Sequence, residues 1–335
     1  MIRRTAVLCA AVAAAVALAA CGEKSEPSGS AAQVKRLTLM LDYFPNADHA
    51  GIYEAQADGE FRRAALDVRI ETPSDPSAPL KLLAAGKVDL AVSYEPEVLL
   101  ARDRGAKVVS IGALVQRPLT SVIAVGKKLR SAADLAGRTV GTAGIPYQSA
   151  YLKTIVAESK AHEPAKEVNV GFDLVPAMLS HKVYATLGAF WNYEGVQLAR
   201  EHRHPSILRI DRLGVPTYDE LVIVARTNEV RERGALLRRF MQALARGHRS
   251  LREDPAKGID ALLKANRDLD KGLQKAAVKA TMSSFFPSDT TKPFGWQSPS
   301  AWAAYTRWMA RNRLIRLPAN PTAALTNEYL PGQGV

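Results

Sequence analysis

Cysteine is scarce in this sequence: only Cys9 and Cys21 occur among 335 residues. That shortage excludes a disulfide-stabilised scaffold, a cysteine-rich zinc site and an iron–sulfur cluster held by several thiolates. Long apolar runs are also missing, because no stretch beyond residue 20 approaches the roughly 18 consecutive apolar residues of a transmembrane helix. What the chain does contain, 47% hydrophobic and 23% charged residues, is typical of a globular protein, and its length favours two domains over one.

Motifs that signal catalysis or nucleotide binding are absent as well. The sequence has no GxxxxGK[ST] phosphate loop, no GxGxxG after a strand, no HExxH and no GxSxG. His202 and His204 lie close together but lack a neighbouring carboxylate or thiol that would complete a metal site. We therefore predict a protein that is not an enzyme and that has no resident metal or cofactor.

The first twenty residues have the pattern of a secretory signal. Arg3 and Arg4 precede an apolar stretch from residue 6 to residue 20, which is too short for a membrane span. Small residues before Cys21 resemble the lipobox of bacterial lipoproteins, which predicts lipidation of Cys21 and anchoring at the extracytoplasmic face of the cell membrane. Residues 21–34 read as a flexible tether. The alternative is plain secretion with an incidental cysteine.

Basic residues outnumber acidic ones, 45 to 33, and the formal net charge is +12. From residue 228 onward the chain is predicted to be helical, with apolar residues at helical spacing on one face. Arginines line the opposite face without interleaved aromatic residues, so we expect a solvated surface and no nucleic-acid partner. These arginines are Arg231, Arg233, Arg238, Arg239, Arg246, Arg249 and Arg252.

Strand-like and helix-like segments alternate along the chain. Apolar runs at 37–41 and 88–92 alternate with helical patterns at 47–57 and from Pro79, which favours an open α/β sheet with ligands at the carboxyl ends of its strands. The β-rich runs at 121–125 and 220–225 bracket about a hundred residues, as two crossover strands between lobes would. We predict an α/β protein of two lobes, each a mixed sheet flanked by helices: 35–123 with 225–335, and the inserted 124–224.

Three segments combine aromatic and acidic residues where loops are expected: 42–49, 93–97 and 189–195. Aromatic area with a few polar groups is the usual composition of a small-molecule pocket. Carboxylates select ligands that donate protons, whereas an anion site would need arginine or helix N-terminal amides. Each segment also has a structural alternative, with Asn46 as a helix cap, Phe44 and Phe190 in the core, and Glu97 solvated.

These segments resemble those of thiamine-pyrimidine-precursor-binding proteins. Similar blocks lie at 41–49, 84–97, 190–195, 216–220 and 326–329, so the resemblance extends from about residue 35 to the end. It implies a type 2 periplasmic-binding fold, a small heteroaromatic ligand such as formylaminopyrimidine between the lobes, and an ABC permease as partner. We expect a monomer. A sulfonate or a riboflavin-like molecule stays open as the ligand.

The resemblance also implies which side chains bind the ligand. The first lobe would supply Tyr43, Asn46, His49, Tyr94 and Glu95, the second Trp191, Tyr193 and Glu194, with Asp42, Tyr147 and Asp219 as further candidates. Eukaryotic relatives of this fold are pyrimidine synthases with a cysteine-rich iron motif. This chain has no cysteine after Cys21, which argues against that enzymatic alternative.

Overall fold

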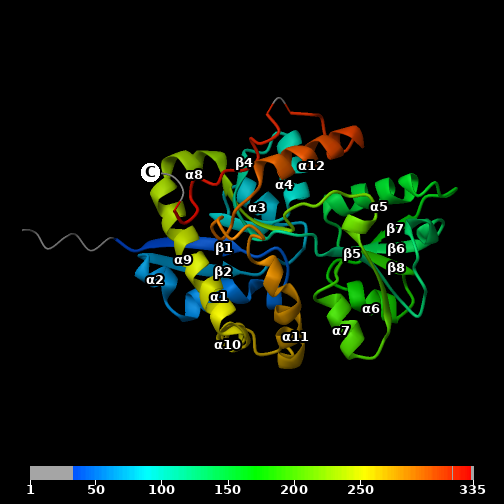
Figure 1. Ribbon diagram of the computed structural model, residues 1–335, viewed down its shortest axis with the longest axis horizontal. Coiled ribbons are helices and arrows are strands. Elements are labelled where there is room, and N and C mark those ends of the chain that lie inside the picture. Colours follow the sequence, from blue (N-terminus) through cyan, green and yellow to red (C-terminus); the bar gives the residue numbers. More distant parts are fainter. Residues whose placement is uncertain (1–32, 319, 333–335) are drawn as a thin grey trace, which may run out of the picture. The chain divides into compact units, whose positions relative to one another are not determined.

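A computed structural model of the protein describes residues 33–318 and 320–332 (Figure 1). The predicted signal peptide, Cys21 and most of the predicted tether lie outside these residues. Within the described residues the strands form two five-stranded sheets, each of them mixed. The α/β prediction with two lobes is therefore confirmed. In this part of the chain, every helix falls short of the length and apolar character that crossing a membrane requires.

The first sheet has the strand order β2-β1-β3-β10-β4. Strand β1 runs parallel to β2 and β3, whereas β10 runs antiparallel to β3 and β4. Buried apolar side chains of β3 and β10 place the centre of this sheet in the core. Its strands are β1 (Lys35–Met40), β2 (Leu66–Glu71), β3 (Leu90–Ser93), β4 (Val108–Val115) and β10 (Leu221–Arg226).

The second sheet repeats that arrangement with the order β7-β6-β8-β5-β9. Here β6 runs parallel to β7 and β8, and β5 runs antiparallel to β8 and β9. In each sheet the fourth position is thus taken by the antiparallel strand through which the chain arrives from the other lobe. The strands are β5 (Thr120–Val125), β6 (Thr139–Thr142), β7 (Lys166–Asn169), β8 (Ala185–Phe190) and β9 (Pro205–Arg209).

Two irregular segments, 116–119 and 213–220, connect the lobes, and we call them the linkers. They replace the crossover strands that the sequence predicts, because β5 lies wholly in the second sheet and β10 wholly in the first. The change of lobe therefore falls a few residues from the predicted boundaries at 124 and 225. Glu220 ties the linkers together, since its carboxylate accepts hydrogen bonds from the backbone N–H groups of Leu119 and Thr120 at 2.6 and 2.8 Å.

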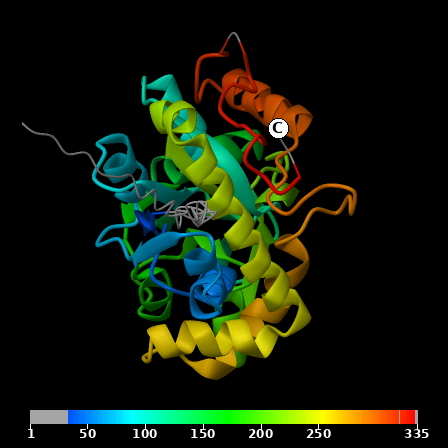
Figure 2. The same ribbon diagram turned by 90° about the vertical axis from the view of Figure 1, so that its left-hand side faces the viewer.

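Helices flank both sheets. Helices α3 and α4 pack near β3 and β4 of the first sheet, and α5, α6 and α7 pack near β8 of the second. In Figure 2, helix α9 runs diagonally across the front of the molecule, and α10 lies below it. The α-helices are α1 (Ala50–Ala57), α2 (Glu60–Arg63), α3 (Pro79–Ala84), α4 (Glu95–Asp103), α5 (Pro146–Glu158), α6 (Leu174–Leu179), α7 (Glu194–Arg200), α8 (Thr227–Glu232), α9 (Gly234–Glu253), α10 (Pro255–Ala265), α11 (Lys271–Thr281) and α12 (Pro299–Arg311).

Two features of the first lobe depart from the sequence prediction. The sequence does not predict strand β4, because its continuous apolar run has no period that distinguishes a strand from a buried helix. The described residues after α12 are not helical: they return to the first sheet, where Leu325 forms a bridge with Ser110. The arginines of α9 are also not all fully solvated, since the Arg238 side chain is only 25% exposed.

Candidate functional site

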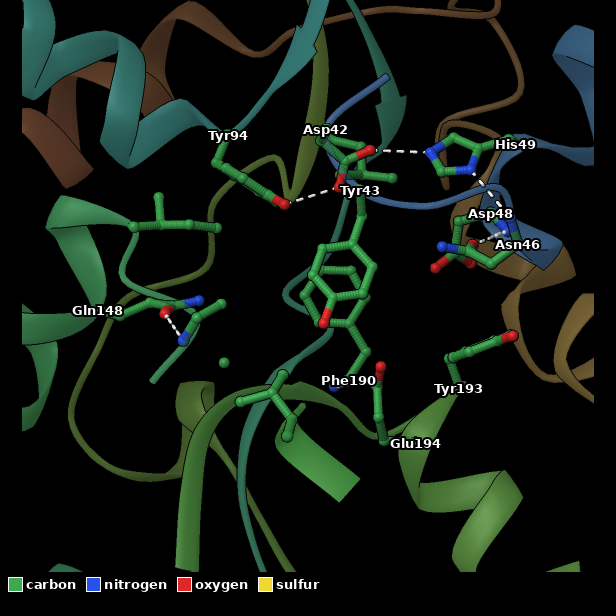
Figure 3. A pocket seen from close by; sticks show the side chains of 15 residues that line it. Asp42, Tyr43, Asn46, Asp48, His49, Tyr94, Gln148, Phe190, Tyr193 and Glu194 are labelled. Carbon is green, nitrogen blue, oxygen red and sulfur yellow. Dashed lines mark hydrogen bonds and ion pairs between the residues drawn. The ribbon is translucent and has the colours of Figure 1, made fainter. Parts of the chain in front are cut away.

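A cleft cavity opens between the two lobes, at the carboxyl ends of β1, β3 and β8 (Figure 3). Its free space is about 20 Å³, which holds one or two water molecules. The residues that line it are Asp42, Tyr43, Asn46, Asp48, His49, Tyr94, Ala143, Ile145, Gln148, Leu174, Gly188, Phe190, Tyr193, Glu194 and Leu221. Residues 42–49, Tyr94 and Leu221 form the wall of the first lobe, and the others form the wall of the second.

A continuous hydrogen-bond network fixes the first wall. Tyr94 donates to Asp42 Oδ2 at 2.7 Å, and His49 Nε2 lies 2.8 Å from Asp42 Oδ1. The backbone N–H of Asn46 donates to His49 Nδ1 at 3.2 Å, so the ring proton is on Nε2, which donates to Asp42. The Asn46 side chain caps the 3₁₀ turn Ala47–His49 by accepting from Asp48 N at 2.8 Å. Both carboxylate oxygens of Asp42 are thereby engaged within the protein.

Asp48 is the acid of the first wall that keeps an oxygen available. Asn192 of the second lobe donates to its Oδ1 at 2.7 Å, and the Thr281 hydroxyl donates to the same atom at 3.0 Å. Oδ2 is buried and has no hydrogen-bond partner. Burial raises the pKa of Asp48 to about 6. A ligand that donates a proton to Oδ2 would satisfy this atom and favour the ionised form of the carboxyl.

The second wall has fewer internal bonds. Glu194, at the start of α7, accepts from the backbone N–H of Phe190 at 2.7 Å, and burial raises its pKa to about 7. Gln148 Oε1 accepts from Ala143 N at 2.8 Å, which leaves the side-chain NH₂ group beside the cavity. Gly188 lies against that amide with a φ of +112°, and a Cβ there would collide with Gln148 Nε2. The close approach therefore requires glycine.

Contacts between the two lobes hold the cleft closed. Tyr43 donates to the carbonyl of Phe172 at 3.1 Å, and Gln274 of α11 donates to the Tyr193 hydroxyl at 3.1 Å. Asn192 joins them through Asp48 and through Thr281 Oγ1, 2.6 Å away. Tyr43 and Phe190 point into the middle of the cavity from opposite lobes (Figure 3). A ring-sized ligand therefore has to enter while the lobes are apart.

The charged side chains that line the cleft cavity are all acidic. Three acids line it, Asp42, Asp48 and Glu194, and its lining includes no lysine or arginine. The described residues also contain no cluster of three or more histidine, cysteine or acidic side chains placed to hold a metal ion. The arrangement suits a neutral or cationic molecule that donates several hydrogen bonds, and it disfavours an anion, whose charge would lie beside buried carboxyls.

The structure brings seven of the predicted site residues to this cavity: Asp42, Tyr43, Asn46, His49, Tyr94, Tyr193 and Glu194. Four others lie elsewhere. Glu95 and Asp219 line a second cavity, and Tyr147 is buried with its hydroxyl 3.3 Å from Thr120 Oγ1. Trp191 packs under the guanidinium of Arg209, 4.6 Å from the ring centre, and donates to the carbonyl of Pro118 at 3.0 Å.

Asp48, Gln148, Gly188 and Phe190 line the cavity but are not among the predicted site residues. Asp48 lies inside a predicted segment and is separated from Asp42 by six positions, so its acidic character was a usable signal. Gln148 and Gly188 give no signal of their own, because each matters only through its contact with the other.

Comparison with known proteins agrees with this architecture. The model of the family described as NMT1/THI5 like matches residues 46–258. The formylaminopyrimidine-binding protein of Halalkalibacterium halodurans is 33% identical over 85% of this chain and 88% of its own length. A 4-amino-5-hydroxymethyl-2-methylpyrimidine phosphate synthase of Saccharomyces cerevisiae is 24% identical over 88% of both chains. The alkanesulfonate-binding protein of Xanthomonas axonopodis pv. citri, solved with MOPS, superimposes with a TM-score of 0.68 at 16% identity, covering 88% of this chain and 99% of that one.

Proposed function

We propose that this chain, which belongs to the NMT1/THI5-like family, is the extracytoplasmic solute-binding protein of an ABC importer and binds a thiamine pyrimidine precursor in its cleft. The two-lobe fold supports the carrier role, because lobes joined by two linkers close on a ligand by a hinge motion. The relative named as a formylaminopyrimidine-binding protein supports the ligand class. We propose no catalytic role for the residues of the cleft.

The observation that carries the proposal is the set of acids in a cavity lined by neither lysine nor arginine. An aminopyrimidine offers N–H donors and a ring nitrogen that can be protonated, and such groups would donate to Asp48 Oδ2, which has no partner in the protein, and to Glu194. Its flat ring suits Tyr43 and Phe190, which enter the cavity from the two lobes (Figure 3). A sulfonate would instead place its negative charge against these carboxyls, at a cost of several kcal/mol.

Anchoring at the extracytoplasmic face of the membrane through lipidated Cys21 is part of the same proposal. Its support is the signal-like sequence of residues 1–20 and the small residues before the cysteine. The tether would attach the monomeric protein to the membrane, where the protein would deliver its ligand to the permease.

Calorimetry with formylaminopyrimidine tests the proposed ligand, with an alkanesulfonate as the competing anion. We expect binding of the pyrimidine alone and a loss of at least about tenfold in affinity for Glu194→Gln, because a hydrogen bond to a charged group contributes ~1.5–3 kcal/mol. Glu97→Gln is the matched control. Glu97 is equally buried and its pKa is also raised by burial to about 7, yet it lies outside the cleft and accepts from Ser93 Oγ at 2.5 Å. Binding of the sulfonate but not of the pyrimidine would contradict the proposal.

A further inference from the structure

A second cavity, which we call the linker cavity, lies where the two linkers meet α4 and the start of α12. Its volume is about 320 Å³, within the range of small-molecule sites, and it shares no lining residue with the cleft cavity. Both linkers contribute to its wall. The lining residues are Glu95, Gln116, Thr217, Tyr218, Asp219, Pro287, Ser288, Asp289, Lys292, Trp296, Ser298, Ala301 and Trp302.

Two buried carboxyl groups meet at this cavity. Glu95 is 1% exposed and Asp219 is 8% exposed. Glu95 Oε2 accepts from the backbone N–H of Asp219 at 2.8 Å, and Asp219 Oδ2 accepts from the Trp302 indole N–H at 2.7 Å. Glu95 Oε1 has no hydrogen-bond partner, and neither does the Gln116 side-chain nitrogen in the same wall. The pair thus lacks one donor.

No base of the protein supplies that donor. Among the described residues, no lysine, arginine or histidine lowers the pKa of either carboxyl. Burial is the main cause that raises the pKa values of both carboxyls, that of Asp219 to about 7 and that of Glu95 well above its ordinary value. The charge of Asp219 raises the pKa of Glu95 further. Lys292 and Asp289 of the 287–292 loop line the same cavity, as does Tyr218 of the linker, and Tyr305 of α12 lies close enough to Glu95 for its charge to raise the pKa of the Tyr305 hydroxyl. At neutral pH the pair therefore retains a proton that a ligand cation can displace.

The aromatic wall is also suited to a cation. The Lys292 ammonium already lies 4.7 Å from the ring centre of Trp296 at the edge of the cavity. This contact shows that an indole of this wall accepts an ammonium group on its face, where a ligand would compete with Lys292. Trp302 adds a second indole beside the carboxyls.

We propose that the linker cavity binds a small organic cation, with a primary ammonium group between Glu95 and Asp219 and an apolar body against Trp296 and Trp302. An ammonium brings three N–H donors, which matches the unpartnered oxygen of Glu95 and the remaining acceptor capacity of Asp219. The site does not depend on the proposed function of the cleft.

Titration with 2-phenylethylammonium, against its neutral isostere 2-phenylethanol, tests this site by calorimetry and by tryptophan fluorescence. We expect the cation to bind at least tenfold more tightly than the alcohol. Glu95→Gln and Asp219→Asn should each lose at least tenfold in affinity, while Glu97→Gln, at a buried acid that lines neither cavity, should bind like the unaltered protein. Lys292→Met should bind the cation more tightly, because it removes a competing charge from the rim.

The pH dependence provides a test that needs no variant to fold. Ionised carboxyls attract the cation, so its affinity should rise as the pH increases from 6 through about 7 to 8, with release of a proton on binding. Equal affinity for the cation and the alcohol, affinity that is the same at pH 6 and pH 8, or no binding of the cation at millimolar concentration would each overturn the proposal.

Discussion

The two walls of the cleft cavity are built in different ways. The first wall comes from one short stretch, residues 42–49, with Tyr94, and its polar side chains bond to one another. The second wall gathers side chains from five places between Ala143 and Glu194, and these bond mainly to backbone groups near them in sequence. The difference indicates that the first wall is preorganised, whereas the second wall supplies unengaged groups that meet the ligand when the lobes close.

The largest effect is expected from breaking the network of the first wall. Asp42→Ala removes the acceptor of both Tyr94 and His49 and leaves two buried donors unpaired. At ~2 kcal/mol for each unpaired group, the free energy of unfolding should fall by about 4 kcal/mol, and ligand binding should be lost. Urea denaturation measures the change.

Asp67→Ala is the control for this prediction. Asp67 pairs with Arg36 at 3.4 Å on the surface, where both side chains are more than half exposed, so its loss should cost under ~0.5 kcal/mol. Similar losses for the two variants would show that the first wall is no more preorganised than an exposed ion pair.

A smaller effect, dependent on pH, is expected in the second wall. The pKa of Glu194 is about 7 in the folded protein against an ordinary 4.5, so the native state binds more protons between these values and loses stability as the pH rises through them. A difference of 2.5 units corresponds to at most about 3 kcal/mol. Glu194→Gln removes this loss. Without ligand, the variant should therefore gain up to that amount relative to the unaltered protein between pH 5 and pH 8.

Unfolding at the two pH values measures this gain, with Glu201→Gln as control. Glu201 is exposed at the end of the same helix, so this replacement removes a surface charge of the same helix without touching a buried group. A gain that is the same at both pH values would contradict the assignment to a buried carboxyl.

How much the sequence reveals also differs between the walls. Strand β1 ends at Met40 and is followed at once by the polar and aromatic residues of the first wall, so strand position and composition together predicted that wall. The second wall depends on the contact of Gln148 with Gly188 and on the direction of Phe190, none of which has a local pattern. Contacts such as that of Gln148 with Gly188 join residues far apart in the sequence, so only the structure reveals them.

The same reason explains the errors in the fold. Alternating segments predicted the α/β class and the two lobes, whereas the linkers were placed inside strands because apolar runs do not reveal which sheet they join. Glu95 was predicted beside the ligand with its neighbour Tyr94. As the first residue of α4, it turns to Asp219 and the linker cavity instead.

The smallest effect on ligand affinity is expected for a substitution of Trp191, although a large effect is expected for its neighbour Phe190. Phe190 ends β8 and lines the cleft, whereas Trp191 is held by Arg209 and by the carbonyl of Pro118 outside it. Trp191→Ala should lower stability through lost packing but change the affinity for formylaminopyrimidine by less than about threefold. Phe190→Ala should reduce it by tenfold or more, since an aromatic contact with a ring ligand contributes ~1.5 kcal/mol with its buried area. Calorimetry on the two variants compares the last residue of β8 with the aromatic residue that follows it. If Trp191→Ala reduced the affinity more than Phe190→Ala, the ligand would contact the second lobe at Trp191, beside the linker that contains Pro118. Phe190 would then be a core residue.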